Sequence, residues 1–300
     1  MKEDIIISID IGGTTFESAI LDKDYLNIIN MSSKSHVRDY SDSESLLDAI
    51  CYQINNLLDQ NEISQKNIQG LSVACPGPLD SKNGIILDTP NIKFLQNVNI
   101  KKELEDKCKM PVYIENDANL FSLGEWYSHY KQNNIVVGVT LGTGLGFGLI
   151  INGELFKGGN GFAMEYGLSP FEWGICEKNV CISYIKQRSK ELYGEEVRPV
   201  IIEKYVKNND KKAIQIYDDF GENLGIVLSH IVNMIDPEII TIGGGLSKAF
   251  ECYKDKMSST LQKFSPSFNI NNITISPSIL RGESTMIGAS LMVKKYKLSL

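Results

Sequence analysis

The chain has 300 residues, of which 42% are hydrophobic and 22% are charged, and its formal net charge is -7 at pH 7. This length allows two domains with their own cores, and the negative charge argues against a general nucleic-acid surface. The most apolar window, residues 135–151, is interrupted by glycines and is too short to span a bilayer, and no signal peptide is evident. We therefore expect a cytoplasmic protein with no membrane or nucleic-acid partner and with reduced cysteines.

Two apolar strands each run into a glycine-rich turn and continue as a second strand. The first turn follows residues 5–9 and begins with Asp10, and the second follows residues 135–139 and begins with Thr140. Glycine lets a backbone approach a phosphate closely, and the N–H groups of such a turn form a concave anion site. Two such turns could hold a polyphosphate from both sides. Because only the first turn carries an acid, Asp10 is the candidate for handling a metal ion.

Strands and helices alternate along the rest of the chain, which predicts an α/β fold. Helices are expected over residues 44–60, 99–108, 120–130, 212–235 and 283–295, with another beginning at Ser247. Further strands are expected over residues 68–74, 112–114, 239–242 and 273–276. Residues 153–184 are rich in glycine and turn formers, which indicates a long irregular segment.

The run Glu115-Asn116-Asp117-Ala118-Asn119 directly follows a predicted strand. An Asn-Asp pair at that position is compatible with a simple turn or helix cap, with Asn119 as a candidate cap. It is equally compatible with catalysis, because in phosphoryl transfer to an alcohol an aspartate accepts the hydroxyl proton. Asn116 would then hydrogen-bond neighbouring hydroxyls of a polyol.

These motifs, taken in order, resemble those of the ROK family of sugar kinases and repressors, over essentially the whole chain. The segments that carry the resemblance are Asp10-Ile11-Gly12-Gly13-Thr14, Pro76-Gly77-Pro78, Pro90-Asn91, Glu115 to Asn119, Leu141 to Gly146 and Gly243 to Leu246. The resemblance implies an α/β, actin-like, duplicated (ribonuclease H-like) fold of two lobes. The expected lobes are residues 1–118, completed by the C-terminal helix 284–300, and residues 119–283, which carry nucleotide and dimer surfaces.

The resemblance also implies a role for each matching residue. Asp117 would be the general base on the 6-hydroxyl of the sugar, and Asp10 would position Mg²⁺ with ATP. The sugar-binding residues would be Gly77, Asn91, Asn116, Asp117 and Glu165. The ATP-binding residues would be Asp10, Gly12, Gly13, Thr14, Thr140, Gly142, Thr143, Gly144, Gly244 and Gly245.

The segment after Glu165 departs from the family pattern. Leu168 stands where most members have a zinc-ligating and sugar-binding His, and the cysteine loop retains only Cys176 and Cys181. Two thiolates do not complete a tetrahedral zinc site, so we expect no zinc. Buried apolar packing is the expected role of both thiols.

The expected activity is therefore ATP-dependent phosphorylation of the 6-hydroxyl of a hexose or N-acetylhexosamine. The apolar Leu168 favours N-acetylmannosamine, giving N-acetylmannosamine 6-phosphate, and the alternatives are a glucokinase or fructokinase of the same family. A sugar-sensing repressor is disfavoured, because Asp10 is the tenth residue and leaves no room ahead of it for a helix-turn-helix domain. A non-catalytic sugar-binding regulator stays open. The resemblance implies a homodimer that forms through the second lobe.

Overall fold

A computed structural model describes residues 5–22, 27–89, 92–172, 174–280 and 282–298. The chain forms two compact units. Unit 1 comprises Met1–His129, Leu155–Ala163 and Gly282–Leu300, and unit 2 comprises Tyr130–Glu154 and Met164–Arg281. The lobe boundary expected near residue 118 stays a prediction.

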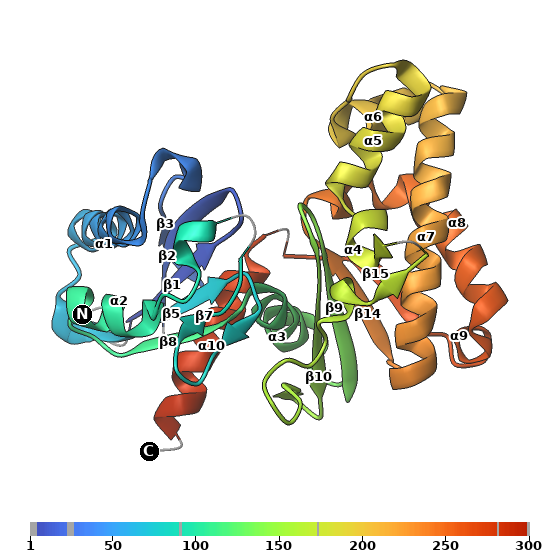
Figure 1. The fold of residues 1–300 in the computed structure, drawn as a ribbon. Coiled ribbons are helices and arrows are strands. Elements are labelled where there is room, and N and C mark those ends of the chain that lie inside the picture. The colour runs from blue at the N-terminus through green and yellow to red at the C-terminus, as the bar shows by residue number, and fades with distance from the viewer. Residues whose placement is uncertain (1–4, 23–26, 90–91, 173, 281, 299–300) are drawn as a thin grey trace. The chain divides into compact units, whose positions relative to one another are not determined.

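Unit 1 is built on a twisted mixed sheet in the order β3-β2-β1-β5-β8, with β4 added beside β2 (Figure 1). Its strands are β1 Ile5–Ile11, β2 Thr15–Leu21, β3 Ile28–Met31, β4 Ser35–His36, β5 Ile68–Cys75 and β8 Val112–Asn116. Strands β1, β2 and β3 form an antiparallel meander, and β5 and β8 run parallel to β1. The carboxyl ends of β1, β5 and β8 therefore share one edge of the sheet.

Helices cover the sheet of unit 1 and complete its core. They are α1 Ser43–Gln60, α2 Ile100–Cys108, α3 Asp117–His129 and α10 Ser284–Leu298, with the short helices η1 Val37–Asp39, η2 Gln65–Asn67 and η3 Lys93–Leu95 and the hairpin of β6 Leu79–Asp80 and β7 Ile85–Ile86. The C-terminal helix α10 packs on α3, β1 and β5. The Ser284 hydroxyl donates to Glu125 Oε1 at 2.5 Å, and the Ser8 hydroxyl donates to the Met286 carbonyl at 3.0 Å. Residues from both ends of the chain thus build one core.

Unit 2 repeats the sheet topology of unit 1, in the order β11-β10-β9-β14-β15. Its strands are β9 Ile135–Leu141, β10 Leu145–Ile151, β11 Glu154–Leu155, β14 Ile239–Gly243 and β15 Thr274–Pro277. Strands β9 and β10 form an antiparallel hairpin, and β14 and β15 run parallel to β9. The predicted duplicated α/β fold is confirmed by this matching order.

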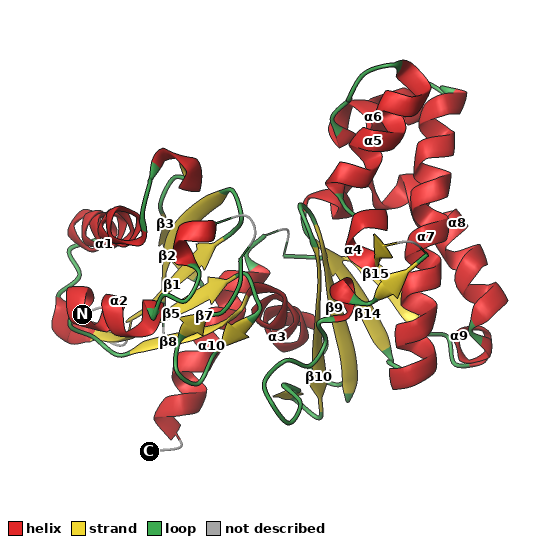
Figure 2. Cartoon of the chain, in the orientation of Figure 1, coloured by secondary structure: helices red, strands yellow, loops and turns green. Residues whose placement is uncertain are grey.

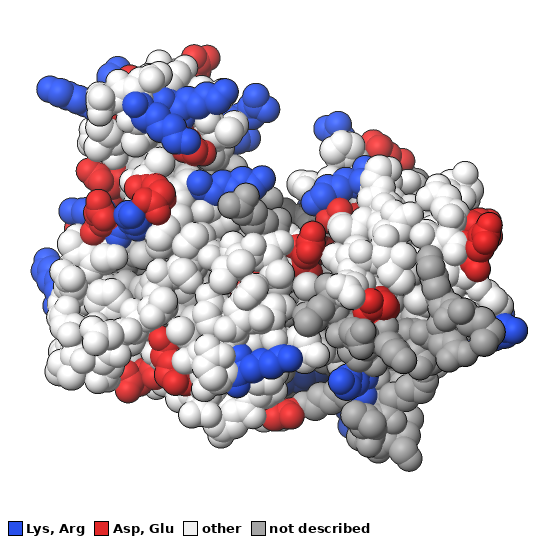
Figure 3. Space-filling view, turned by 180° about the vertical axis from the view of Figure 1, so that it is seen from behind, with Lys and Arg blue, Asp and Glu red and all other residues white. Residues whose placement is uncertain are grey.

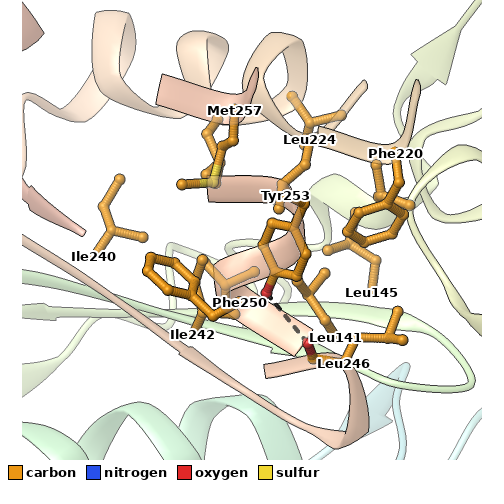
Figure 4. Packing of buried hydrophobic residues seen from close by; sticks show 14 of the residues in the cluster. Leu141, Leu145, Phe220, Leu224, Ile240, Ile242, Leu246, Phe250, Tyr253 and Met257 are labelled. Atoms are coloured by element: carbon orange, nitrogen blue, oxygen red, sulfur yellow. Dashed lines mark hydrogen bonds between the residues drawn. The ribbon is translucent and has the colours of Figure 1, made fainter. Parts of the chain in front are cut away.

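Helices make up most of the rest of unit 2 (Figure 2). They are α4 Cys176–Asn179, α5 Ile182–Tyr193, α6 Pro199–Lys207, α7 Lys211–Ile235, α8 Phe250–Phe264 and α9 Pro266–Ile270, with η4 Tyr166–Leu168, η5 Gly245–Ala249 and the pair β12 Pro170–Phe171 and β13 Gly174–Ile175. The long amphipathic helix expected over 212–235 is α7. Figure 4 shows Phe220 of α7 and Tyr253 of α8 together above the sheet, with ring centroids 5.1 Å apart. The buried Tyr253 hydroxyl donates to the Leu246 carbonyl at 3.3 Å, which satisfies its polar end.

Basic side chains are visible over the end of unit 2 that carries α5 and α6, at the upper left of Figure 3. Two cations of these helices have acidic partners, since Arg188 of α5 pairs with Asp219 and Lys207 of α6 pairs with Glu203. The surface there is locally mixed in sign. In the described part of the chain, no helix has the length and apolarity needed to cross a membrane.

Candidate active site

Asp10 lies near the carboxyl end of β1, just before the first glycine-rich turn. The turn is closed by a hydrogen bond from the Gly12 N–H to the Thr15 carbonyl at 2.8 Å, and the Val37 N–H donates to the Thr14 carbonyl at 3.0 Å. In the hairpin register Asp10 lies opposite Glu17 of β2. Side chains of directly opposed residues lie on the same face of a sheet, so two carboxylates flank this turn.

The environment of Asp10 disfavours its ionised form. Burial, followed by repulsion from Asp117 and Glu17, raises the pKa of Asp10 to about 7, although Lys34 acts in the opposite direction. Lys34 Nζ contacts Glu17 Oε1 at 3.0 Å. The sequence reasoning did not include Glu17 or Lys34, although the hairpin pairing predicts that Glu17 faces Asp10. The cluster carries more negative than positive charge, which suits a divalent cation.

Asp117 begins α3, directly after β8. Asn116 Oδ1 accepts hydrogen bonds from the N–H groups of Ala118 at 2.9 Å and Asn119 at 3.2 Å, so Asn116 caps this helix. The expectation that Asn119 is the cap is wrong, because Asn119 is buried inside the first turn and donates to Glu115 Oε1 at 3.1 Å. Capping fixes the orientation of Asn116, whose Nδ2 group makes no hydrogen bond within the described residues.

The Asp117 carboxylate is held by the same helix start. Its Oδ1 accepts a hydrogen bond from the Ala118 N–H at 2.8 Å. Burial raises the pKa of Asp117 to about 6, and the hydrogen bond from Ala118 opposes that shift. A carboxylate with a pKa near 6 is ionised at neutral pH and is a stronger proton acceptor than an exposed aspartate, as a general base requires.

Glu115, two residues before Asp117, forms a buried polar contact. Its Oε2 atom forms an ion pair with Lys157, and its Oε1 atom accepts a hydrogen bond from the Asn116 N–H at 3.0 Å. Lys157 belongs to the segment Leu155–Ala163, which is part of unit 1 although it is flanked in sequence by unit 2. The sequence analysis assigned no role to Lys157, because its partner lies 42 positions away along the chain.

The strand registers bring Asp10 and Asp117 to one edge of the sheet. Asp10 aligns with Ala74 of β5, and Ala74 aligns with Glu115 of β8. Two strand spacings separate β1 from β8, or about 10 Å. Ligands of open α/β sheets bind at such carboxyl ends. A cation and a hydroxyl group could therefore be handled side by side.

The residues at this edge fit Mg²⁺ carried in with a polyphosphate. Within the described residues, no three His, Cys, Asp or Glu side chains are grouped to hold a metal by themselves. Mg²⁺ commonly uses one or two protein carboxylates, with phosphate oxygens and water as its other ligands. The raised pKa of Asp10 fits this arrangement, because a cation would favour its ionised form.

The second glycine-rich turn belongs to unit 2. The Gly142 N–H donates to the Gly144 carbonyl at 3.0 Å, and the Ile182 N–H donates to the Gly142 carbonyl at 2.9 Å. No hydrogen bond within the described residues uses the N–H groups of Thr143 and Gly144. The Thr143 hydroxyl likewise takes part in no hydrogen bond among the described residues.

Glu177 of α4 is hydrogen-bonded to the residue that follows this turn. Its Oε2 atom accepts a hydrogen bond from the Leu145 N–H at 3.1 Å. A Cβ atom at Gly144 would come within 2.4 Å of the same oxygen, so Gly144 makes room for the carboxylate. The sequence analysis gave Glu177 no role, because its partner Leu145 lies 32 positions away along the chain.

Gly244 and Gly245 follow β14, which pairs with β9 beside this turn. Gly244 has a φ of +80°, and a Cβ atom there would lie 2.3 Å from the Leu141 carbonyl. Gly244 is therefore needed for the chain to pass close to the end of β9. Both glycines are exposed, which leaves their backbone accessible.

The predicted site residues fall into two sets. Unit 1 contains Asp10, Gly12, Gly13, Thr14, Gly77, Asn116 and Asp117, and unit 2 contains Thr140, Gly142, Thr143, Gly144, Glu165, Gly244 and Gly245. Asn91 lies outside the described residues. A cavity of about 560 Å³ in unit 1 is lined by the β6–β7 hairpin, β8 and residues 157–162, and by none of the predicted site residues.

The segment that follows Glu165 is ordered by packing and hydrogen bonds. Cys176, Val180 and Cys181 are buried, and Cys181 Sγ lies 3.0 Å from the Ser183 hydroxyl. Tyr166 contacts Phe147 edge to face, and its hydroxyl lies 2.5 Å from His230 Nδ1. Leu168 is 54% exposed. A solvent-exposed leucine is available to contact a ligand.

These contacts predict that the purified protein contains no zinc. Metal analysis of protein prepared without chelators should find less than about a tenth of an equivalent of zinc, because within the described residues no group of three or more His, Cys, Asp or Glu side chains could hold a metal ion. A variant with both Cys176 and Cys181 changed to Ala should show the same metal content. A full equivalent of zinc in the unmodified protein would contradict this expectation.

Two matching sheets, each with a glycine-rich hairpin turn, define a duplicated α/β protein of the actin-like fold class. The family model of the ROK family matches residues 6–296, and the chain belongs to this family. The chain is 30% identical over 267 residues to an N-acetyl-D-glucosamine kinase of Photobacterium profundum, with 82% of this chain and 86% of the relative covered.

Other relatives differ in function. A xylose repressor of Caldicellulosiruptor bescii is 26% identical over 318 residues, with 98% of this chain and 79% of the repressor covered. The solved structure of a ROK family glucokinase from Streptomyces griseus, in complex with glucose and AMPPNP, has a TM-score of 0.82 at 23% identity, with 97% of this chain and 99% of that chain covered. At that identity the likeness concerns the fold.

Proposed function

We propose that the protein transfers the γ-phosphoryl group of ATP to the 6-hydroxyl of a hexose or N-acetylhexosamine. The observation that carries this proposal is the pair Asp10 and Asp117 at one edge of the unit 1 sheet, both with a raised pKa. The Asp10 carboxylate is suited to binding a cation, and the Asp117 carboxylate is suited to accepting a proton. Membership of the ROK family, which includes sugar kinases among this chain's relatives, supports the same reaction.

In the proposed reaction Asp117 accepts the proton of the 6-hydroxyl group while the oxygen of that hydroxyl attacks the γ-phosphorus atom of ATP. The Nδ2 group of Asn116 hydrogen-bonds a neighbouring hydroxyl, since the Oδ1 atom of that side chain caps α3. Gly77, Asn91 and Glu165 complete the proposed sugar site. When bound with ATP, Mg²⁺ neutralises charge on the phosphates, and Asp10 is the residue proposed to position it.

The proposed phosphate contacts are backbone and hydroxyl donors. In unit 1 they come from Gly12, Gly13 and Thr14, and in unit 2 from Thr140, Gly142, Thr143 and Gly144. Neutral donors suit a polyphosphate because their N–H and O–H groups stabilise its negative charge by hydrogen bonding. Gly244 and Gly245 are proposed to lie along the adenosine.

N-acetylmannosamine is the substrate that we propose first. Leu168 supports this choice, because an exposed apolar side chain suits the methyl group of an acetamido substituent better than it suits a hydroxyl. The N-acetyl-D-glucosamine kinase among the relatives also acts on an N-acetylhexosamine. Glucose and fructose are the alternative substrates.

An ATP-consumption screen tests the proposal. Glucose, fructose, mannose, allose, N-acetylglucosamine and N-acetylmannosamine are each supplied with MgATP, and at least one should give sugar-dependent ADP release. The xylose repressor among the relatives favours a second candidate, a sugar-binding regulator. Sugar binding in a thermal-shift assay without turnover on any sugar would support that candidate and refute the kinase.

Glu177 supplies a prediction about the second phosphate turn. Changing Glu177 to Ala removes the acceptor of the Leu145 N–H, and we expect the KM for ATP to rise about tenfold, since a hydrogen bond to a charged group contributes about 1.5–3 kcal/mol. Changing Glu177 to Gln should preserve most of the affinity, because the amide oxygen still accepts. The neighbouring exposed residue offers a control, Lys178→Ala. A lower KM in Glu177→Gln would instead mean that the carboxylate repels ATP.

A cytoplasmic location and a homodimer are part of the same proposal. Cell fractionation tests the location. Light scattering at several protein concentrations tests the dimer, which should persist without a ligand.

A further inference from the structure

Two cysteine side chains of unit 1 contact each other. Cys51 lies in α1 and Cys108 is the last residue of α2, and their Sγ atoms are 3.2 Å apart. Both side chains are half-buried, whereas Cys75, Cys176 and Cys181 are fully buried. Cys252 is half-buried on α8 of unit 2. The pair therefore combines close approach with partial access to solvent.

Independent contacts hold the two helices at this position. Lys107 Nζ lies 2.5 Å from Asp48 Oδ1, one turn before Cys51 on α1. Gln65 Nε2 donates to the Cys108 carbonyl at 2.9 Å. A disulfide requires an S–S distance of about 2.05 Å, so the sulfur atoms must approach by about 1 Å. Rotation of the two side chains can supply most of this movement while the helices keep their positions.

The pKa values of the two thiols shift in opposite directions. The hydrogen bond with Cys108, and next the nearby charge of Lys107, lower the pKa of Cys51, while burial and Asp48 oppose this. The pKa of Cys108 is raised, first by its hydrogen bond with Cys51 and then by burial. Cys51 is therefore the candidate nucleophile of the pair.

We propose that Cys51 and Cys108 are a reversible disulfide site that joins α1 to α2 when the protein meets hydrogen peroxide. The Cys51 thiolate attacks one peroxide oxygen, the O–O bond breaks, and hydroxide leaves, so that Cys51 becomes a sulfenic acid. The Cys108 sulfur then attacks the Cys51 sulfur. An S–S bond forms, the S–O bond breaks, and the departing hydroxide takes the Cys108 proton as water. Two thiols are oxidised while one peroxide is reduced.

The bond would join α1 to α2 within unit 1. It links residues 57 positions apart and encloses β5 within the closed loop. A cross-link of that span stabilises a protein mainly by restricting the unfolded chain. Cys108 precedes β8, whereas Asn116 is the last residue of that strand and Asp117 follows it. Oxidation should therefore raise the Tm.

Peptide mapping of the full-length protein after treatment with hydrogen peroxide tests the site. We expect one peptide pair joined through Cys51 and Cys108, a mass loss of two hydrogens, reversal by dithiothreitol, and a Tm several degrees higher in the oxidised form. Cys51→Ser and Cys108→Ser should each abolish the cross-link, and Cys108→Ser should leave a sulfenic acid at Cys51 that dimedone traps. Cys252→Ser is the control and should cross-link normally.

Two results would overturn the disulfide site. One is oxidation of Cys51 to sulfinic acid in the unmodified protein without any joined peptide. The other is cross-linking of either thiol to Cys252 of a second molecule. Because the measurement is a mass and not an activity, its outcome is independent of the proposed kinase reaction.

Discussion

The variant Asp117→Asn should lose at least about 100-fold in turnover, the usual contribution of a positioned general base. Asn has nearly the shape of Asp but does not accept a proton at neutral pH. Sugar and ATP affinities should change little, because the cap of α3 by Asn116 and the Ala118 contact with an amide oxygen both persist. Steady-state kinetics and calorimetric sugar binding measure the two effects separately.

The exposed carboxylate of Asp59 on α1 offers a matched control, since Asp59→Asn removes the same charge away from the site. That variant should retain full turnover. Residual turnover above about a tenth of normal in Asp117→Asn would show that Asp117 is not the base. Equal losses of turnover and of sugar affinity would indicate a positioning role instead.

Asp117→Asn should also make the protein more stable at pH 8. Burial raises the pKa of Asp117 from 3.8 to about 6 in the folded state. The unfolded chain therefore releases this proton at lower pH than the folded chain does. The free energy of unfolding therefore falls as the pH rises from about 4 to 6. Above pH 6 the ionised Asp117 lowers it by up to about 3 kcal/mol.

Thermal unfolding at two pH values measures this cost. At pH 8 the Tm of Asp117→Asn should exceed that of the unmodified protein by a few degrees, whereas at pH 4 the two should nearly coincide. The control Asp59→Asn should show no such gain at either pH. An Asp117→Asn variant that is less stable at pH 8 would mean that the ionised carboxylate is well solvated or paired in the folded state.

Much of the fold could be predicted because its strands are continuous apolar runs. Ile5–Ile11 and Ile135–Leu141 are almost entirely buried, and each ends at a glycine-rich turn. By contrast, α5 and α6 were not predicted. The buried apolar residues of these two helices are Ile185 and Ile202, one in each, so neither sequence has a wide apolar face.

The candidate site could be predicted where one local segment carries its chemistry. Asp10 is the next-to-last residue of β1 and Asp117 directly follows β8, and topology alone brings such residues to one edge of a sheet. Lys157 and Glu177 could not be predicted, because their partners, Glu115 and Leu145, lie far away along the chain. Long-range pairing is a property of the fold and leaves no local pattern.

Mass spectrometry of the sugar pool after incubation with MgATP tests the central proposal most directly. The kinase account predicts that one hexose or N-acetylhexosamine gains a single phosphoryl group, with one ADP formed per sugar, and that Asp117→Asn forms this product at least about 100-fold more slowly. ADP formed without a phosphorylated sugar, or sugar bound but never phosphorylated, would contradict it.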